Sequence, residues 1–195
     1  DLDLAIEDLD PLRPTVRWMD RRNKFGWDCP DAIYATIPVD ESATYRLTGR
    51  RGNVHFYGFQ VAAGIRTLAN ADADDFTCDA DGRFEVILGG PAREKNWIPL
   101  EPGARWVFVR QFFYDWSREE PAPLWIDRID GGVPSAASGL LDPASFARRL
   151  DAVATNVEAS IELWLGTALA LRERFLNAFP AEAFGGTAMG AMKHQ

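Results

Sequence analysis

Apolar residues in the first two thirds of the chain come in short runs that alternate with polar residues. Successive side chains of a β-strand point to opposite faces of a sheet, so a period of two is typical of strands. The strongest hairpin signal is the turn Asp81-Gly82 between two such runs. The pattern predicts strands over residues 32–39, 44–49, 54–61, both halves of 76–88, 96–100, 106–116 and 124–130. Strands this short favour a mainly β fold, an antiparallel β-sandwich or jelly roll, over alternating strands and helices.

Nearer the C-terminus the apolar period changes to three and four, which is typical of an amphipathic α-helix. Asp142 followed by Pro143 is the pattern of a helix N-cap and a first helical residue. The apolar stripe consists of Phe146, Leu150, Val153, Val157, Ile161, Trp164, Ala168, Leu171 and Phe175. We expect one long helix over 142–177, with Gly166 as the point where it would break or kink. Its partner is either the sandwich or a second domain or subunit.

These patterns divide the chain into four segments. Residues 1–31 are expected to form an acidic arm or short helix, 32–133 the β-sandwich domain, 142–177 the long helix and 178–195 a flexible tail. With 195 residues, the chain is long enough for one large domain and an appended helix. A chain of this size can bury its core without disulfides or metals.

Charge narrows the set of expected partners. The chain has 21 basic and 29 acidic residues and a net charge of −8. An acidic chain lacks the positive surface that binds nucleic acid or anionic membranes, so we expect neither as a partner. No apolar run approaches the roughly 20 residues that span a bilayer, and no signal peptide is recognisable. A cytoplasmic location is therefore expected, although a start at Asp1 leaves a removed leader open.

Several kinds of site lack their sequence motifs. No glycine-rich phosphate loop follows a strand and no G-x-S-x-G elbow is present, so we expect no nucleotide and no other cofactor. The two histidines, His55 and His194, are too few for a histidine metal site. Cys29 and Cys78 lack the short spacing of zinc ligands. We therefore expect no metal and two free, partly buried thiols.

The stretch WVFVRQFFYDW, residues 106–116, places polar residues inside an aromatic strand. By alternation, Arg110 shares one face with five aromatic residues, and Gln111 and Asp115 lie on the other face. The aromatic residues are Trp106, Phe108, Phe112, Tyr114 and Trp116. A guanidinium buried among them must be paired or hydrogen-bonded. Arg110 is then either held structurally, by a carboxylate such as Asp31 or Asp115 or by a ring, or it binds an anion or oxygen atom of a ligand.

Three other residues are candidates for a site. His55 is the neutral-pH acid or base of the folded body, although a histidine on an otherwise apolar face is more often structural. Trp97 either anchors a turn or offers a stacking wall for a sugar or an aromatic ring. Asp31, which follows Cys29-Pro30, either caps a turn or works with Asp28 in acid–base chemistry.

Several blocks of the sequence resemble one protein family. The runs WDCPDAIY, YRLTGRRGNVHFYGFQV, DGRFEVILGG, NWIPLEPGARWVFVRQFFYDW and EEPAPLWIDRID are similar, in this order, to bacterial proteins of domain-of-unknown-function family twelve-fourteen, often joined to family twelve-fifty-four. The similarity spans about residues 28–130, with Cys29 in place of the usual asparagine. It implies a jelly-roll β-sandwich, a helical linker and a further β domain, of which this chain resembles the N-terminal part. The shared positions that it implies are Asp31, Tyr34, Trp97, Arg110 and Asp115.

Together these features predict a small-molecule-handling β-sandwich domain. Its pocket would be lined by Trp97, Arg110, Tyr114 and Trp116, with His55 at the rim and Asp31 and Tyr34 as further ligand-binding candidates. As an enzyme it would be a cofactor-independent lyase or hydrolase of an oxygenated organic substrate. Arg110 would stabilise negative charge, and His55 or Asp115 would move the proton.

Two alternatives remain open. One is a non-catalytic carbohydrate- or aromatic-binding module, which would present a shallow aromatic surface in place of a deep pocket. The other is a structural subunit or half of a larger protein. In that case the long helix would dock a second domain, a subunit or another copy of the chain, and the protein would be an oligomer.

Overall fold

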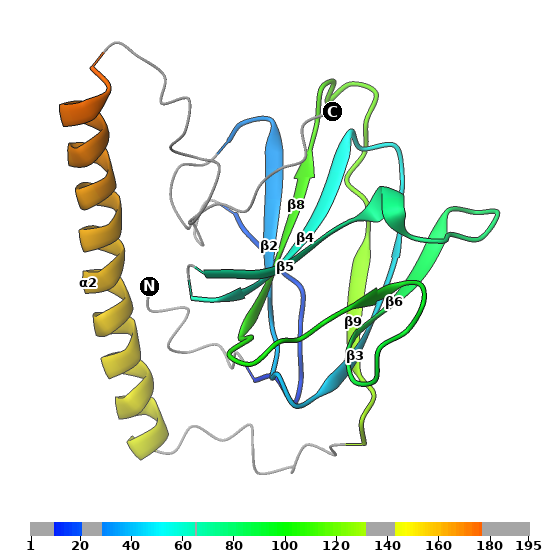
Figure 1. Ribbon diagram of the computed structural model, residues 1–195, viewed down its shortest axis with the longest axis horizontal. Coiled ribbons are helices and arrows are strands. Elements are labelled where there is room, and N and C mark those ends of the chain that lie inside the picture. Colours follow the sequence, from blue (N-terminus) through cyan, green and yellow to red (C-terminus); the bar gives the residue numbers. More distant parts are fainter. Residues whose placement is uncertain (1–9, 21–28, 65, 132–142, 177–195) are drawn as a thin grey trace. The chain divides into compact units, whose positions relative to one another are not determined.

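The computed structural model describes residues 10–20, 29–64, 66–131 and 143–176. The described residues belong to two compact units, a β unit and the helix α2, Pro143–Arg174 (Figure 1). No helix in these four ranges is long and apolar enough to cross a lipid bilayer. The tail expected over 178–195 lies outside the described residues.

Two sheets make up the β unit (Figure 1). Sheet A has the strand order β1-β2-β8-β4-β5, and sheet B has the order β7-β6-β3-β9. The strands of sheet A are β1 (Arg17–Trp18), β2 (Ala32–Pro38), β8 (Trp106–Phe112), β4 (Phe56–Ala63) and β5 (Arg66–Asp72). Those of sheet B are β7 (Trp97–Ile98), β6 (Arg83–Gly89), β3 (Thr44–Arg50) and β9 (Leu124–Arg128). A 3₁₀ turn, η1 (Ala73–Asp75), follows β5.

The pairing of β6 with β7 is parallel, whereas the other pairings are antiparallel. Gly89, Gly90 and Asn96 adopt positive φ and turn the chain back along β6, so that only two residues pair with it. Sheet B is therefore mixed, which corrects the expectation of a purely antiparallel fold. The chain is mainly β with one C-terminal helix, as predicted, and the jelly-roll topology stays a prediction.

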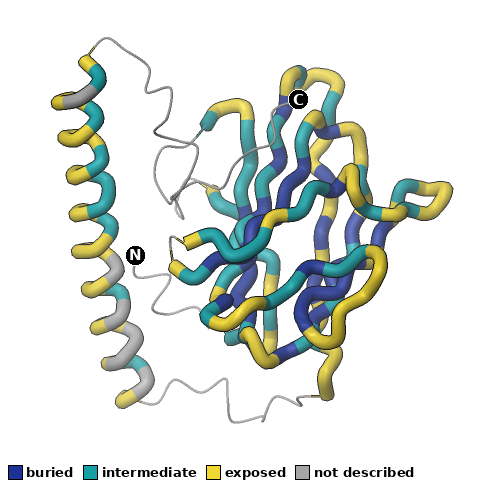
Figure 2. The backbone as a smooth tube through the Cα atoms, in the orientation of Figure 1, coloured by how far each residue is buried: buried dark blue, intermediate teal, exposed yellow. Residues whose placement is uncertain are grey.

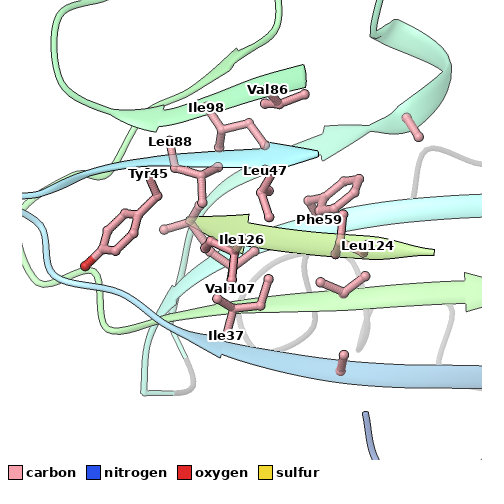
Figure 3. Packing of buried hydrophobic residues seen from close by; sticks show 14 of the residues in the cluster. Ile37, Tyr45, Leu47, Phe59, Val86, Leu88, Ile98, Val107, Leu124 and Ile126 are labelled. Carbon is pink, nitrogen blue, oxygen red and sulfur yellow. The ribbon is translucent and has the colours of Figure 1, made fainter. Parts of the chain in front are cut away.

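The inner faces of the two sheets share one hydrophobic core (Figure 3). Buried side chains of sheet A meet those of sheet B there. Sheet A contributes Ile37, Phe59 and Val107, and sheet B contributes Tyr45, Leu47, Leu88 and Ile126. Burial alternates along β3 and β8, as the period of two predicts (Figure 2). Two sheets around one core is the arrangement of a β-sandwich.

Most predicted strands lie close to their expected positions, but several differ. The strand β1 belongs to the segment expected to be an arm, and it extends sheet A by pairing with β2. The strand β5, with the sequence RTLANAD, is absent from the predicted set. Its position at the edge of sheet A explains this, because an edge strand can carry small and polar residues without a clear alternation.

The hairpin predicted within 76–88 is wrong in its first half. The turn at Asp81-Gly82 forms, because the Asp79 carboxylate accepts the backbone N–H groups of Asp81 and Arg83 at 2.9 and 2.8 Å. The segment before it does not pair with β6 as a strand. Thr77 instead exchanges hydrogen bonds with the Asn96 side chain, at 2.8 and 2.9 Å. A side-chain amide has taken the place of a strand partner.

The helix α2 runs from Pro143 to Arg174 without a break, against an expected extent of 142–177. The predicted break or kink at Gly166 is wrong in that the helix continues through this residue. One glycine costs a helix only about 1 kcal/mol relative to alanine, so the rest of a long helix can carry it. The partner of α2 stays a prediction.

Candidate functional site

An open groove of about 1260 Å³ lies at one end of sheet B. Its floor is formed by residues of β3, β6 and β9, both outward-facing side chains and the inward-facing Gly49 and Phe84. Its wall is the segment from Arg118 to Pro123. The turn between β3 and β4 and the turn before β6 complete its rim. Both polar and aromatic side chains line it, which is the usual make-up of a small-molecule site.

One residue that lines this groove, which we call the Trp125 groove, is a large exposed aromatic side chain. Trp125 is 59% exposed on β9, directly opposite Thr48 of β3, which in turn lies opposite Glu85 of β6. Residues opposite one another in antiparallel strands point to the same face of the sheet. An apolar ring therefore lies in one row with a hydroxyl and a carboxylate on an open surface.

Two arginines stand in the next row of the same face. Arg50 of β3 is paired in register with Arg83 of β6, and both residues are exposed. Among the described residues, no carboxylate forms an ion pair with either guanidinium. The Asp79 carboxylate at the rim is engaged with backbone N–H groups. The groove thus holds two unpaired cationic donors beside its aromatic ring.

The wall of the groove is held by two side-chain amides. On its outer side, Asn53 donates to the Arg118 carbonyl at 2.7 Å and accepts the Glu120 N–H at 3.0 Å. On its inner side, the fully buried Gln111 donates to the Ala122 carbonyl and accepts the Ala122 N–H, both at 2.8 Å. Each amide satisfies one donor and one acceptor of the segment, so the wall is fixed to the β3–β4 turn and to β8 of sheet A.

The floor depends on a glycine. A Cβ atom on Gly49 of β3 would lie 2.6 Å from the Phe84 ring and 2.9 Å from the Pro123 carbonyl oxygen. The absence of a side chain therefore lets the wall segment approach β3, where the Arg50 N–H donates to the same carbonyl at 3.3 Å.

Arg110, the central residue of the sequence hypothesis, lies on the outer face of sheet A, away from this groove. It is half-buried, and its register partners are Tyr34 on β2 and Gly58 on β4. Its guanidinium carbon lies 6.0 Å from the centre of the Phe108 ring. Burial lowers the pKa of Arg110 below its ordinary value, and the neighbouring Tyr34 acts in the opposite direction. Neither Asp31 nor Asp115 forms the salt bridge that the sequence suggested.

The strand β8 ends at Phe112, which corrects the expected face of five aromatic residues. Tyr114 and Trp116 lie beyond the strand in the following loop, because the Glu119 carboxylate accepts the N–H groups of Tyr114 and Asp115. The Arg110 face of β8 therefore carries three aromatic residues, Trp106, Phe108 and Phe112.

His55 and Asp115 have structural contacts at the start of β4 and in the β8–β9 loop. The His55 ring stacks on the Tyr114 ring at 3.6 Å between centroids, and the backbone N–H of His55 donates to the Glu119 carboxylate at 2.9 Å. The Asp115 carboxylate accepts both the N–H and the hydroxyl of Ser117, at 2.9 and 2.6 Å. These hydrogen bonds lower the pKa of Asp115, which makes its carboxylate a weaker base.

The predicted pocket lined by Trp97, Arg110, Tyr114 and Trp116 is not assembled as one site. Trp97 belongs to β7 at the edge of sheet B, where its indole N–H donates to the Gly89 carbonyl at 2.9 Å. Trp116 stacks on Phe113 at 3.8 Å. The structure does bring together two pairs of candidates, Tyr34 with Arg110 and His55 with Tyr114. Asp31 lies in the turn before β2, where its carbonyl accepts the Phe113 N–H at 2.8 Å.

The described ranges contain no group of three or more histidine, cysteine or acidic side chains that could hold a metal ion. Cys29 and Cys78 are free and half-buried, as predicted.

Comparison with known proteins identifies the fold but no activity. A crystal structure of an uncharacterized protein from Burkholderia cenocepacia matches with a TM-score of 0.76 and 32% sequence identity, over 89% of this chain and 50% of that protein. The chain thus spans half the length of that protein, and it shares a β-rich fold with it. A structure from Vibrio parahaemolyticus matches with a TM-score of 0.34 and 14% identity, over 60% of this chain and 31% of that one, too little to indicate a common fold. No family model and no curated protein matches the chain, and the resemblance to family twelve-fourteen stays a prediction.

The residues that line the Trp125 groove were not among the sequence candidates. A signal for Trp125 exists in the run LWIDR, where alternation sends Trp125 and Asp127 to the face opposite Leu124 and Ile126. Alternation does not tell which face is the core, and a tryptophan is ordinarily assigned inside. The pairing of Arg50 with Arg83 depends on the register of two strands and has no local signal.

Proposed function

We propose that the β unit is a binding module that holds a small polyhydroxylated ligand, a saccharide, in the Trp125 groove. The observation that carries this proposal is the 59% exposure of Trp125 in a row with Thr48 and Glu85. Exposing a large indole to water is unfavourable unless a partner covers it. A sugar ring offers an apolar C–H face to the indole and hydroxyl groups to the neighbouring polar side chains.

Binding without turnover is favoured over catalysis by the way the acid–base candidates are distributed. His55 and Asp115 lie in structural contacts, and Arg110 lies on the other sheet. The groove is open to solvent, which supports the carbohydrate- or aromatic-binding hypothesis and not an enclosed reaction pocket.

The test is isothermal titration calorimetry of the purified chain with a panel of soluble oligosaccharides. Trp125→Ala is expected to weaken binding about tenfold or more, since truncating a central aromatic contact of an interface typically costs over 1 kcal/mol. Trp116→Ala is the matched control, because this tryptophan is also exposed, at 46%, and does not line the groove. Equal affinities of the Trp125→Ala variant and the unmodified chain would exclude the groove as the saccharide-binding site. Release of a product from any bound sugar would exclude a purely binding role.

A second candidate function remains the cofactor-independent lyase or hydrolase, favoured by the absence of a described carboxylate partner for the half-buried Arg110. In that proposal an anionic oxygen of the substrate binds the Arg110 guanidinium beside Tyr34. Arg110→Ala would then abolish binding or turnover of an oxygenated organic acid while the circular dichroism spectrum stays unchanged. A variant that unfolds would instead indicate a structural role.

A further inference from the structure

We propose that the ligand of the Trp125 groove is anionic, a saccharide with a carboxylate such as a uronic acid, whose carboxylate binds between Arg50 and Arg83. This inference rests on the proposed function and specifies its ligand class. The two arginines are directly opposite on β3 and β6, on the face of sheet B that also carries Trp125.

Arg50 and Arg83 form an unfavourable pair of like charges across two strands. Directly opposite residues of antiparallel strands have Cβ atoms about 5 Å apart, and like charges there destabilise the sheet. Elsewhere on the same sheet, an arginine is paired with an acid: Arg46 of β3 forms a 3.2 Å ion pair with Asp127 of β9. Arg50 and Arg83 have no such described partner. A bound anion would relieve this repulsion.

The distance between the arginines and the ring also supports this inference. Thr48 and Arg50 are two residues apart on β3, and Glu85 and Arg83 are two apart on β6. Two residues of a strand span about 7 Å. A pyranose stacked on Trp125, in the row of Thr48 and Glu85, therefore lies about 7 Å along the strands from the row that contains Arg50 and Arg83. Arg50 lies one strand and Arg83 two strands, about 10 Å, to the side of Trp125, so a carboxylate on the next sugar along can bind between the two guanidinium groups.

The chemistry of the donors supports it as well. Guanidinium groups bind carboxylates through paired N–H donors, and two of them can bind one carboxylate from either side. Glu85 and Glu120 in the same groove would accept hydrogen bonds from sugar hydroxyls and repel further negative charge. With a net charge of −8, the whole chain also disfavours long polyanions. The expected ligand is therefore a short saccharide with few carboxylates.

The experiment uses trisaccharides of galacturonate, glucuronate and mannuronate and compares each with its methyl ester, which lacks the negative charge and adds only a methyl group. Binding is measured by calorimetry at low and high salt. At least one acid is expected to bind ten times more tightly than its ester, with an affinity that falls as salt is added. In Arg50→Gln and in Arg83→Gln, the affinity for the acid should fall to the affinity for the ester. Trp125→Ala should weaken both compounds. Arg93→Gln, an exposed arginine outside the groove, is the control and should change neither.

The outcomes separate this inference from the proposed function. Equal affinities of acid and ester, both lost in Trp125→Ala, would overturn the anionic ligand and leave the saccharide site in place. Failure of every acid in the panel to bind overturns the inference, while binding of a neutral oligosaccharide would still support the proposed function. The thermal midpoint of Arg83→Gln without ligand is an independent readout. It should equal or exceed that of the unmodified chain, and a clear decrease would show that Arg83 is structural.

Discussion

Two buried tyrosines of the β unit differ in what surrounds their hydroxyl groups. The Tyr45 hydroxyl accepts the Asp40 N–H at 2.9 Å and donates to the Pro11 carbonyl at 3.0 Å. The Tyr57 hydroxyl is buried without a hydrogen bond of standard geometry to any described residue. It faces the Gln111 amide, which uses one N–H and its oxygen in the two hydrogen bonds with Ala122. An unsatisfied buried hydroxyl is a cost, whereas a satisfied one contributes to stability.

Removing the Tyr45 hydroxyl is therefore expected to lower the free energy of unfolding, whereas removing the Tyr57 hydroxyl is not. Tyr45→Phe should lower the free energy of unfolding by about 1–2 kcal/mol, since it leaves a backbone donor and acceptor without partners. Tyr57→Phe should leave stability unchanged or raise it by up to about 1 kcal/mol. Urea denaturation followed by tryptophan fluorescence measures both. A larger loss in Tyr57→Phe than in Tyr45→Phe would show that the Tyr57 hydroxyl is bonded in solution.

Alkaline stability should respond to the same residue. Burial raises the pKa of Tyr57 in the folded protein, whereas the Gln111 amide and the Arg51 guanidinium act in the opposite direction. Because the folded-state pKa exceeds the unfolded value of about 10, this tyrosine stabilises the fold fully below that pH and loses its contribution as the pH rises above it. Tyr57→Phe should consequently unfold at a higher pH than the unmodified chain. Identical alkaline midpoints would contradict the raised pKa.

Neighbouring residues of β8 show that two polar groups in one strand can have opposite effects on stability. Gln111→Met should lower the free energy of unfolding by about 2–4 kcal/mol, because it leaves the buried N–H and carbonyl of Ala122 without hydrogen-bond partners. Arg110→Met should lower the free energy of unfolding by less than about 1 kcal/mol, or raise it. The change removes a desolvated charge without a described ion-pair partner and keeps the apolar part of the side chain. Chemical denaturation compares the two changes, and equal losses would refute this assignment.

The long helix offers a test at a single glycine. A Cβ atom added to Gly166 of α2 would have no heavy atom within 4 Å. Gly166→Ala should raise the thermal midpoint of the helical signal at 222 nm, in line with about 1 kcal/mol of helix propensity. Ala168→Gly, two residues away in the same helix, should lower it and serves as the control. A loss of stability in Gly166→Ala would mean that another part of the protein packs against this residue.

For the chain as a whole, a thiol assay tests whether the protein contains a disulfide. Cys29 and Cys78 are both free. A thiol titration of the unfolded protein should find both, and a reducing agent should leave the melting temperature unchanged, because no disulfide constrains the unfolded state. A drop in melting temperature under reduction would indicate a disulfide.

The chain corresponds to half of the Burkholderia cenocepacia protein, so activities and partners of a longer protein are open to experiment. The docking of α2 on a second domain, a subunit or another copy remains a prediction. A size measurement in solution tests the case of another copy, for which a monomer would count against it.

The mainly β class, most of the strands, the long helix and the central position of β8 follow from the sequence alone, because a period of two or of three to four is a local property of the chain. Alternation also placed Arg110 and Gln111 on opposite faces. The tertiary structure decided which polar residues meet. The Trp125 groove needs the register of β3 against both β6 and β9, and its wall needs Asn53 and Gln111, about 60 residues apart in sequence. Such contacts depend on strand order and long-range pairing, which no local period encodes.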